Sequence, residues 1–548
     1  MIKFDSPLAA FLYWEKEVPD AIFLRQHING KLKTYTFQQS GDEARRIANY
    51  LLTYNLPPQS KIAILSKNCA HWILADIAIM MAGYISIPIY ASSQAETIQY
   101  ILEHSEAKAI IIGKLDGYTS QKPGIANIPK ISVALYGIND GTIWENTVSQ
   151  QEPLQQCAAQ NPKNLITIIY TSGTTGKPKG VMHTIGNFAN ASNTFIENLS
   201  LPEHPVFFSY LPLSHIAERI GIEMGGIYRG ASVTFSESLA TFGRNLEDTQ
   251  PDLFFAVPRI WAKFQEKILQ GIPQKRLSAL LKLPVVNTLI KKKLKKKLGL
   301  SKATLIYSGA APIAPGLVRW YAKIGITVLQ GYGMTEDCIL SHTNTPEANK
   351  IGTVGKVANG ATSKLSAEGE ICIFNNCLMK GYYKNPEETA EAFDDEGYLK
   401  TGDVGEYDHD GFLTITGRAK DQFKTDKGKY ISPAPIELEL SRNPNIEQIC
   451  IVGMGIPQPI LLVVPSLEAS KKNKEDLCKS LIEAIDTINP TLEKHEKIAK
   501  AVVMKEEWTV ENGLMTPTLK IKRNRVENIH SSMYKSWFDA ADRVIFEV

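Results

Sequence analysis

Leu165-Ile166-Thr167-Ile168-Ile169-Tyr170 runs directly into Thr171-Ser172-Gly173-Thr174-Thr175-Gly176-Lys177-Pro178-Lys179-Gly180. The first six residues are apolar or β-branched, which predicts a buried strand. The next ten combine four hydroxyls, three glycines and two lysines. Glycines let backbone amides turn toward an anion, hydroxyls add donors, and lysines neutralise charge. The pattern therefore predicts a loop that holds a polyphosphate, because an ordinary turn needs Gly or Pro but not this concentration of donors.

Two other nucleotide-binding loops can be tested against the same sequence. A P-loop needs Gly five positions before its Gly-Lys pair, but Thr171 occupies that position. Gly331-Tyr332-Gly333 begins a dinucleotide fingerprint, yet the sixth position is Glu336 instead of Gly. Neither Walker-type chemistry nor a Rossmann cofactor site is supported.

The segments around the loop alternate between helical and strand patterns. Up to about residue 240, helical periods separate short apolar runs, as in residues 40–52, 61–65, 75–81 and 109–112. This rhythm predicts an α/β fold with parallel strands. Further along, residues 369–373 and 411–416 alternate every two residues, which is typical of antiparallel strands. We expect helix-covered sheets followed by a small, barrel-like, strand-rich part.

The length of 548 residues exceeds what one hydrophobic core supports, so more than one domain is expected. After Gly417 come a densely charged stretch, a Pro-rich bend at Ser432-Pro433-Ala434-Pro435 and a mixed α/β pattern. We predict an N-terminal domain over residues 1–417, a hinge over 418–421 and a small, mobile α+β domain over 422–548.

The amino-acid composition argues against several classes of protein. With 44% hydrophobic and 21% charged residues the chain resembles an ordinary globular protein, and a net charge of +3 gives no reason to expect a nucleic-acid partner. The seven cysteines lack the short spacing of zinc sites, so neither structural metal nor disulfides are expected. Asp5 and Pro7 stand where a signal peptide needs an apolar run, which indicates the cytoplasm. Asp76 and Pro88 interrupt the apolar stretch 72–90, which is therefore predicted to be a buried helix and a strand.

Separate motifs along the chain occur in the order typical of one family. Besides the loop, they are Ser308-Gly309-Ala310-Ala311-Pro312, Gly331-Tyr332-Gly333-Met334-Thr335-Glu336, Tyr398-Leu399-Lys400-Thr401-Gly402-Asp403, Gly417-Arg418-Ala419-Lys420-Asp421 and Thr516-Pro517-Thr518-Leu519-Lys520. Over essentially its whole length the sequence resembles the adenylate-forming superfamily of acyl-CoA synthetases, luciferases and nonribosomal peptide adenylation domains. The resemblance implies the acyl-CoA synthetase/luciferase-like fold.

The resemblance also implies a nucleotide site. Tyr332 would stack on adenine, Thr335 would contact the α-phosphate and Glu336 would bind Mg²⁺. Asp403 would accept both ribose hydroxyls, and Arg418 would reach the nucleotide. The implied ATP-binding residues are Thr171, Ser172, Gly173, Thr174, Thr175, Gly176, Lys177, Lys179, Ser308, Gly309, Ala310, Ala311, Gly331, Tyr332, Gly333, Thr335, Asp403 and Arg418. The implied catalytic residues are His215, Thr335, Glu336 and Lys520.

Two lysines have special positions in the family pattern. Lys420 matches the hinge, whose backbone rotates between the two half-reactions. Residues 518–522 alternate, so Lys520 and Lys522 share one face and either could reach a ligand. The family's adenylation lysine is followed three residues later by Arg, and Arg523 therefore selects Lys520. There it would offset the charge that concentrates as a carboxylate meets the α-phosphate.

Two segments bear on the acid that is activated. Tyr210-Leu211-Pro212-Leu213-Ser214-His215-Ile216-Ala217-Glu218-Arg219 and Val257-Pro258-Arg259-Ile260-Trp261 resemble motifs of long-chain fatty acyl-CoA synthetases. Amino-acid-activating relatives place an Asp in the first segment, whereas Ser214-His215-Ile216 supplies none, which favours an acid without an amine. His215 is the candidate for the acyl pocket. The lysine-rich run 289–298 predicts a solvated helix or, as a second hypothesis, a surface attracted to anionic lipid.

The resemblance thus implies a long-chain fatty acid–CoA ligase that uses ATP, Mg²⁺ and CoA, making acyl-AMP and pyrophosphate and then acyl-CoA. One alternative is an acyl-AMP ligase that delivers to a carrier protein or another acceptor. The other is a non-catalytic acyl or nucleotide sensor. Peripheral contact with the inner membrane surface, the acyl chain length and the oligomeric state stay open at this point.

Overall fold

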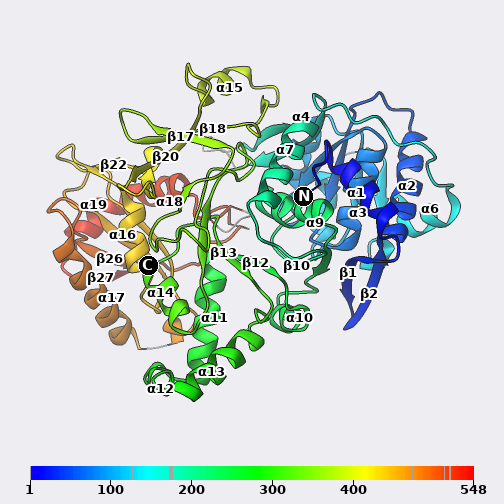
Figure 1. Cartoon of the computed structure of the whole chain (residues 1–548). Helices are drawn as coiled ribbons and strands as arrows, with labels where there is room; N and C mark the ends of the chain where they lie inside the picture. Colours follow the sequence, from blue (N-terminus) through cyan, green and yellow to red (C-terminus); the bar gives the residue numbers. More distant parts are fainter. Residues whose placement is uncertain are drawn as a thin grey trace.

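The computed structural model describes residues 2–125, 127–171, 177–471, 473–510, 512–516 and 520–547. Two large mixed sheets dominate the N-terminal part (Figure 1). The first has the order β19-β9-β8-β4-β3-β5-β6-β7. Its strands are β3 (Lys61–Leu65), β4 (Ile85–Ile89), β5 (Ala109–Ile112), β6 (Lys130–Ser132), β7 (Thr142–Ile143), β8 (Leu165–Thr171), β9 (Lys179–Thr184) and β19 (Gly381–Tyr382). Strands β3 to β8 pair in parallel, as predicted, and β9 returns antiparallel along β8.

The second sheet has the order β16-β15-β14-β13-β12-β10-β11-β1-β2. Its strands are β1 (Ile22–Ile28), β2 (Lys31–Thr36), β10 (Val206–Ser209), β11 (Ser232–Phe235), β12 (Leu253–Ala256), β13 (Leu305–Ser308), β14 (Leu329–Tyr332), β15 (His342–Thr343) and β16 (Lys356–Val357). Its centre is parallel and its two edges are antiparallel. The carboxyl ends of β13 and β14 carry two of the predicted nucleotide motifs.

Helices cover both sheets, and one of them lies between the sheets. They include α1 (Pro7–Glu17), α2 (Phe37–Leu52), α3 (Ala70–Met81), α4 (Ala95–Ser105), α7 (Ile185–Glu197), α10 (Phe242–Thr249), α11 (Pro258–Gly271), α12 (Gln274–Leu280), α13 (Pro284–Lys297) and α14 (Pro315–Lys323). Helix α3 contacts β1 of one sheet and β3 and β4 of the other, and all its residues are buried. The predicted buried helix and strand within residues 72–90 are therefore α3 and β4.

A small antiparallel sheet follows. Strands β17 (Ala361–Leu365), β18 (Glu370–Asn375), β20 (Leu399–Tyr407) and β21 (Leu413–Arg418) pair in that order, and α15 (Pro386–Ala392) lies between β19 and β20 in the chain. Ile371, Ile373 and Leu413 are buried on one face, which is the two-residue period read from the sequence. The two predicted antiparallel strands are thus confirmed.

The chain then passes through a 3₁₀ turn at Ala419–Asp421 into a C-terminal part with its own sheet (Figure 1). This part consists of β22 (Phe423–Lys424), β23 (Tyr430–Ile431), α16 (Pro433–Leu440), β24 (Ile446–Val452), β25 (Ile460–Pro465), α17 (Lys474–Ile488), β26 (Lys500–Val503), α18 (Arg523–His530), α19 (Tyr534–Asp539) and β27 (Val544–Phe546). Two hydrophobic clusters here contain only residues after Asp421. Among the described residues, no helix is long and apolar enough to cross a membrane.

Candidate functional site

The predicted phosphate loop lies between β8 and β9. Thr171, the last residue of β8, pairs with Lys179, the first residue of β9, so both ends of the loop are held in one hairpin. The loop is thus followed by a strand, whereas a P-loop is followed by a helix. Ser172, Gly173, Thr174, Thr175 and Gly176 lie outside the described residues, and their anion contacts stay predictions.

The two lysines of the loop are anchored by neighbouring side chains. Lys179 forms an ion pair with Glu388, and its ammonium lies 5.4 Å from the ring centre of Tyr382. Lys177 lies 5.5 Å from the ring centre of Tyr100. Partial burial lowers the pKa of Lys179, with Lys420 of the predicted hinge acting in the same direction. The binding of a polyphosphate by these two lysines stays a prediction.

Glu336 is buried directly beside these groups. The hydroxyl of Tyr382 donates a 2.9 Å hydrogen bond to Glu336 Oε1. Burial raises the pKa of Glu336, whereas Arg418 and Lys179 act in the opposite direction. Within the part of the chain that the structure describes, no three His, Cys, Asp or Glu side chains gather into a metal cage. A single carboxylate next to a phosphate loop fits Mg²⁺, which commonly takes its remaining ligands from phosphates and water.

The turn that carries Thr335 and Glu336 is strained and tightly packed. Cys338 and Ile339 have φ of 52° and 61°, a conformation that is rare for a β-branched residue such as Ile. A Cβ on Gly333 would stand 2.4 Å from the Cα of Ile339, so only glycine fits there. His183 donates a 2.8 Å hydrogen bond to the Thr335 carbonyl. The packing therefore holds the turn in one shape, and sequence reasoning did not identify His183 as part of it.

Asp403 connects two other predicted nucleotide residues. Its Oδ2 accepts a 2.6 Å hydrogen bond from the Tyr332 hydroxyl, and its Oδ1 accepts one of 2.8 Å from Arg418 Nε. Gly402, at φ 74°, turns the strand so that its N–H donates to Glu370 at 2.8 Å. Each Asp403 oxygen keeps a second lone pair, so the carboxylate can still accept a pair of ribose hydroxyls.

The segment after β13 lies against the segment after β14. A Cβ on Gly309 would stand 3.1 Å from the Gly331 carbonyl oxygen and 2.9 Å from the Phe255 ring, so this glycine permits a close approach. Ala310 has φ of 65°. The Ser308 hydroxyl is buried and has no hydrogen-bond partner among the described residues. Such a group can be satisfied by a ligand, which agrees with the predicted adenine-binding role.

Lys520 belongs to the C-terminal part, and its charge interacts with residues of the predicted nucleotide site. Desolvation by the surrounding protein and then Arg418 lower its pKa, whereas Asp403 and Glu336 act in the opposite direction. The pKa of Lys522 is lowered by burial and by Arg525, with no nucleotide-site residue among its causes. Of the two lysines, only Lys520 has nucleotide-site residues among the causes of its pKa shift, and its catalytic role stays a prediction. Pro517, Thr518 and Leu519 lie outside the described residues, so the alternation predicted over 518–522 is not fully visible.

His215 lies close to Lys520. Desolvation and the nearby Lys520 lower the pKa of His215 to about 4, so its imidazole is neutral at pH 7. Its Nδ1 accepts a 3.2 Å hydrogen bond from the backbone of Ala217 and caps the short helix α8 (Ile216–Glu218). A π-helix over Arg219–Met224 follows immediately. One ring nitrogen of His215 therefore has a structural role as a helix cap. The interaction with the charge of Lys520 places the same side chain near the predicted site.

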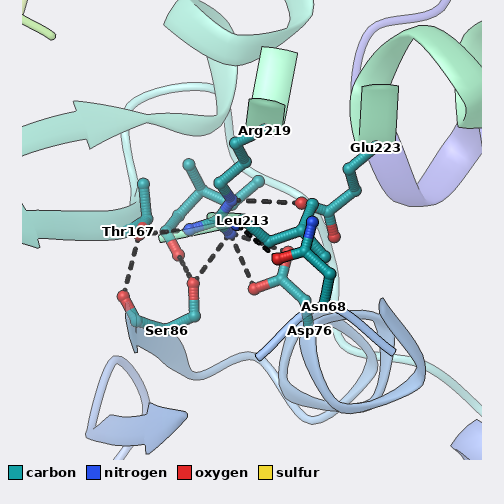
Figure 2. A network of polar contacts seen from close by, with 8 residues as sticks. Asn68, Asp76, Ser86, Thr167, Leu213, Arg219 and Glu223 are labelled. Carbon is teal, nitrogen blue, oxygen red and sulfur yellow. Dashed lines mark hydrogen bonds and ion pairs between the residues drawn. The ribbon is translucent and has the colours of Figure 1, made fainter. Parts of the chain in front are cut away.

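A buried ionic network beneath this segment was missed by sequence reasoning (Figure 2). Arg219 donates to both oxygens of Asp76 at 2.7 Å and to the hydroxyls of Ser86 and Thr167 at 2.9 and 2.8 Å. Glu223, one helical turn further on, lies 3.3 Å from Arg219 Nε. Burial and the neighbouring Asp76 raise the pKa of Glu223 well above its ordinary value, which favours its neutral form. The available signal was the presence of charged residues inside apolar runs, since buried charges need partners.

Comparison with known families and proteins agrees with these motifs. The family model described as AMP-binding enzyme matches residues 11–383, and that of the AMP-binding enzyme C-terminal domain matches residues 420–541. The long-chain-fatty-acid–CoA ligase FadD15 of Mycobacterium bovis is 28% identical, with 95% of each chain covered. Fatty acyl-CoA synthetase A of Dictyostelium discoideum is also 28% identical, over 93% of this chain and 87% of that one.

Solved structures show the same fold. The adenylation domain of a carboxylate reductase from Mycobacterium chelonae superposes with a TM-score of 0.81 at 19% identity, covering 98% of this chain and 91% of that one. The o-succinylbenzoate CoA synthetase of Bacillus subtilis, in complex with its acyl-adenylate intermediate, gives a TM-score of 0.75 at 21% identity, covering 96% and 99%. The resemblance read from the motifs is thus confirmed, and the chain belongs to the family of AMP-binding enzymes.

Proposed function

We propose that the chain is an AMP-forming long-chain fatty acid–CoA ligase. The observation that carries the proposal is the polar grouping at the predicted nucleotide site, where Asp403 accepts hydrogen bonds from Tyr332 and Arg418 and Glu336 accepts one from Tyr382. Lys520 of the C-terminal part lies near enough for Arg418, Asp403 and Glu336 to act on its pKa. The family and its relatives support it, because curated members named as long-chain-fatty-acid–CoA ligases align over nearly the whole chain.

The first step joins the fatty acid to AMP. A carboxylate oxygen attacks the α-phosphorus of ATP, the bond to the bridging oxygen of the β-phosphate breaks, and acyl-AMP and pyrophosphate form. Lys520 offsets the charge that builds up as the two anions meet. Tyr332, Asp403 and Arg418 hold the nucleoside, and the loop from Thr171 to Lys179 holds the phosphates.

Glu336 would hold Mg²⁺, with Thr335 beside it at the α-phosphate. When bound there, Mg²⁺ would supply positive charge that neutralises the phosphates and favours departure of pyrophosphate. Neutral His215 adds no charge next to the acyl carboxylate, and so leaves charge compensation to Lys520. Ser308 to Ala311, together with Gly331 and Gly333, would line the adenine.

The second step transfers the acyl group to CoA. The CoA thiol, losing its proton, attacks the acyl carbonyl carbon, and AMP leaves with the electron pair of the broken acyl–phosphate bond. We assign residues 1–417 to the domain that holds the acyl-adenylate, 418–421 with Lys420 to the hinge, and 422–548 to the domain that rotates between the steps. A cytoplasmic enzyme with peripheral membrane contact completes the proposal, because long acyl chains partition into bilayers.

The direct test is a product analysis with ATP, Mg²⁺ and fatty acids from short to very long, with and without CoA. AMP and acyl-CoA that peak at long chains are the expected products. Acyl-AMP that accumulates despite CoA, but disappears with a holo carrier protein, would instead support an acyl-AMP ligase. ATP binding without AMP from any acid would overturn the proposal in favour of a sensor.

A further inference from the structure

One stretch of the chain is strongly basic although the whole protein is not. Between Glu266 and Glu336 there is no Asp or Glu, while the same stretch contains thirteen Lys or Arg residues. Six of these lysines belong to the second half of α13, which carries no acidic residue. The net charge of the whole chain is only +3, so this charge is local and needs its own explanation.

Helix α13 presents three of these lysines on the same face as exposed apolar residues. Ile290 and Leu294 pack toward the hydrophobic cluster around Trp261 and Tyr321, and this fixes the inner face of the helix. At helical spacing the opposite face contains Val285, Leu289, Lys292, Lys293 and Lys296, all of which are exposed.

The apolar residues of this face are unusually open to solvent. Val285 and Leu289 are 74% and 62% exposed, and Leu283 in the preceding loop is 51% exposed. Within the described residues no carboxylate lies within ion-pair distance of Lys292, Lys293 or Lys296, whereas Lys297 is 3.7 Å from Glu247. Figure 1 shows α12 and α13 at an outer edge of the molecule, where the inner face of α13 packs toward the second large sheet and its outer face is open. The face is therefore both accessible and without an internal electrostatic partner.

We infer that this face of α13, with Leu283, docks on the surface of an anionic lipid bilayer. Lysines that carry no partner are attracted to acidic headgroups, and adjacent exposed aliphatic side chains gain free energy by entering the interface. A nucleic acid would satisfy the lysines but not Leu283, Val285 and Leu289. The combination of both features on one face selects the membrane.

The position of this surface suits the proposed function, on which the docking itself does not depend. Helix α11 begins at Pro258 within the motif that resembles one of long-chain fatty acyl-CoA synthetases, and it ends at Gly271, just before α12. The docking surface is thus continuous in sequence with that motif. An enzyme held at a bilayer by this edge has its acid substrate concentrated nearby.

The test is sedimentation with phosphatidylcholine vesicles that contain or lack phosphatidylglycerol, without ATP, fatty acid or CoA. The parent protein is expected to bind only the anionic vesicles. Changing Lys292, Lys293 and Lys296 to Gln should weaken binding by about fivefold per lysine. Val285→Ser with Leu289→Ser, which keeps every charge, should also weaken it, because the aliphatic groups no longer enter the interface.

A matched control removes the same charge elsewhere. Lys31, Lys163 and Lys535 are exposed and scattered over other surfaces, and changing all three to Gln should leave vesicle binding nearly unchanged. Equal binding by the α13 triple variant and this control would overturn the inference, as would parent protein that stays in the supernatant. If only the lysine variant lost binding and the Ser variant did not, the face would be a polyanion site and not a membrane-docking surface. AMP formation from a water-soluble acid that forms no micelles should be the same in all variants. Loss of membrane docking can therefore be told apart from failure of the catalytic proposal.

Discussion

Arg219 donates 2.7 Å hydrogen bonds to both carboxylate oxygens of Asp76, and neither side chain reaches solvent. The same guanidinium bonds to Ser86 on β4 and Thr167 on β8. Its backbone belongs to the segment that follows His215. One buried side chain therefore ties the strand that leads into the phosphate loop to the segment that is expected to contact the acid.

Arg219→Met should strongly destabilise the protein, because it leaves Asp76 as an uncompensated buried charge. Breaking a buried pair from one side costs about 3–5 kcal/mol. The double variant Asp76→Leu with Arg219→Met should recover part of this loss. Urea unfolding of the parent, the two single variants and the double variant would measure the coupling. Additive effects of the two substitutions would show that the pair does not act as a unit.

Lys520→Ala should remove most of the first half-reaction and spare the second. Loss of a preorganised charge at the reacting atoms lowers the rate of acyl-AMP formation by about 100-fold or more. Thioester formation from supplied acyl-AMP should continue at the parent rate. Lys522→Ala is the matched control, since Lys522 has the same chemistry without the nucleotide-site neighbours. Equal loss of both half-reactions in Lys520→Ala would contradict the assignment.

Asp403→Ala should weaken AMP binding by about 10-fold to 100-fold, as expected when charge-assisted hydrogen bonds are lost. Tyr332→Phe keeps the ring and removes only the hydrogen bond to Asp403, so its effect should be smaller. Isothermal titration with AMP compares the two. A larger loss in Tyr332→Phe than in Asp403→Ala would shift the main ribose contact away from the carboxylate.

Glu336→Gln should raise the Mg²⁺ concentration needed for half-maximal adenylation by at least about 10-fold, because even outer-shell changes at metal sites cost that much. The amide keeps an acceptor for Tyr382 and nearly the same volume. Glu388→Gln removes a carboxylate at Lys179 but not the proposed ligand, so its Mg²⁺ requirement should stay unchanged. A magnesium titration of AMP formation provides the measurement. Identical curves for Glu336→Gln and the parent would exclude the proposed ligand.

The pH dependence of stability should contain a contribution from His342. Burial lowers the pKa of His342 from 6.5 to about 4, while its ring nitrogens contact Ser341 and the Tyr407 hydroxyl at 2.8 and 2.7 Å. The unfolded chain binds the proton more readily, so this contribution is complete above pH 6.5 and is lost as the pH falls toward 4. Between pH 7 and pH 5 it amounts to about 2 kcal/mol.

His342→Gln should therefore lose less stability than the parent between pH 7 and pH 5. Gln can still hydrogen-bond to its two neighbours but does not titrate. Urea unfolding at both pH values measures the difference, and His409→Gln at an exposed position serves as the control. Parallel losses in His342→Gln and the parent would show that this histidine does not contribute.

Local pattern predicted much of the fold. The strand predicted at residues 61–65 is β3 without any change of bounds, because a run of this length is typical of a strand and too short for a helix. The helix predicted from Ser40 begins at Phe37, since Thr36 and Gln39 form a capping box that the apolar period alone does not reveal. The motifs also pointed to Glu336, Asp403 and Arg418, which lie around Lys520 in the structure. This was possible because each motif combines residue types that suit one contact with a nucleotide.

Contacts between distant segments were beyond the sequence. Asp76 and Arg219 stand 143 positions apart, and Lys179 and Glu388 stand 209 apart. One amino-acid sequence indicates that each buried charged side chain needs a partner, but it does not indicate which segment supplies that partner. Asp76 served only as evidence against a membrane span, although a charge in so apolar a run also indicates a buried counterion.

The ion pair between Arg259 and Glu447 connects the N-terminal part to the C-terminal part. Arg259 belongs to α11 of the N-terminal part, and Glu447 to β24 of the C-terminal part. If the C-terminal part rotates about Lys420 as proposed, this pair would break, and its strength would contribute to how long the orientation seen here persists. Both side chains are partly exposed, and pairs of this kind contribute up to about 1 kcal/mol, or roughly a fivefold change in dwell time. Under the proposed rotation, substitutions at this surface ion pair would change the balance between the two half-reactions.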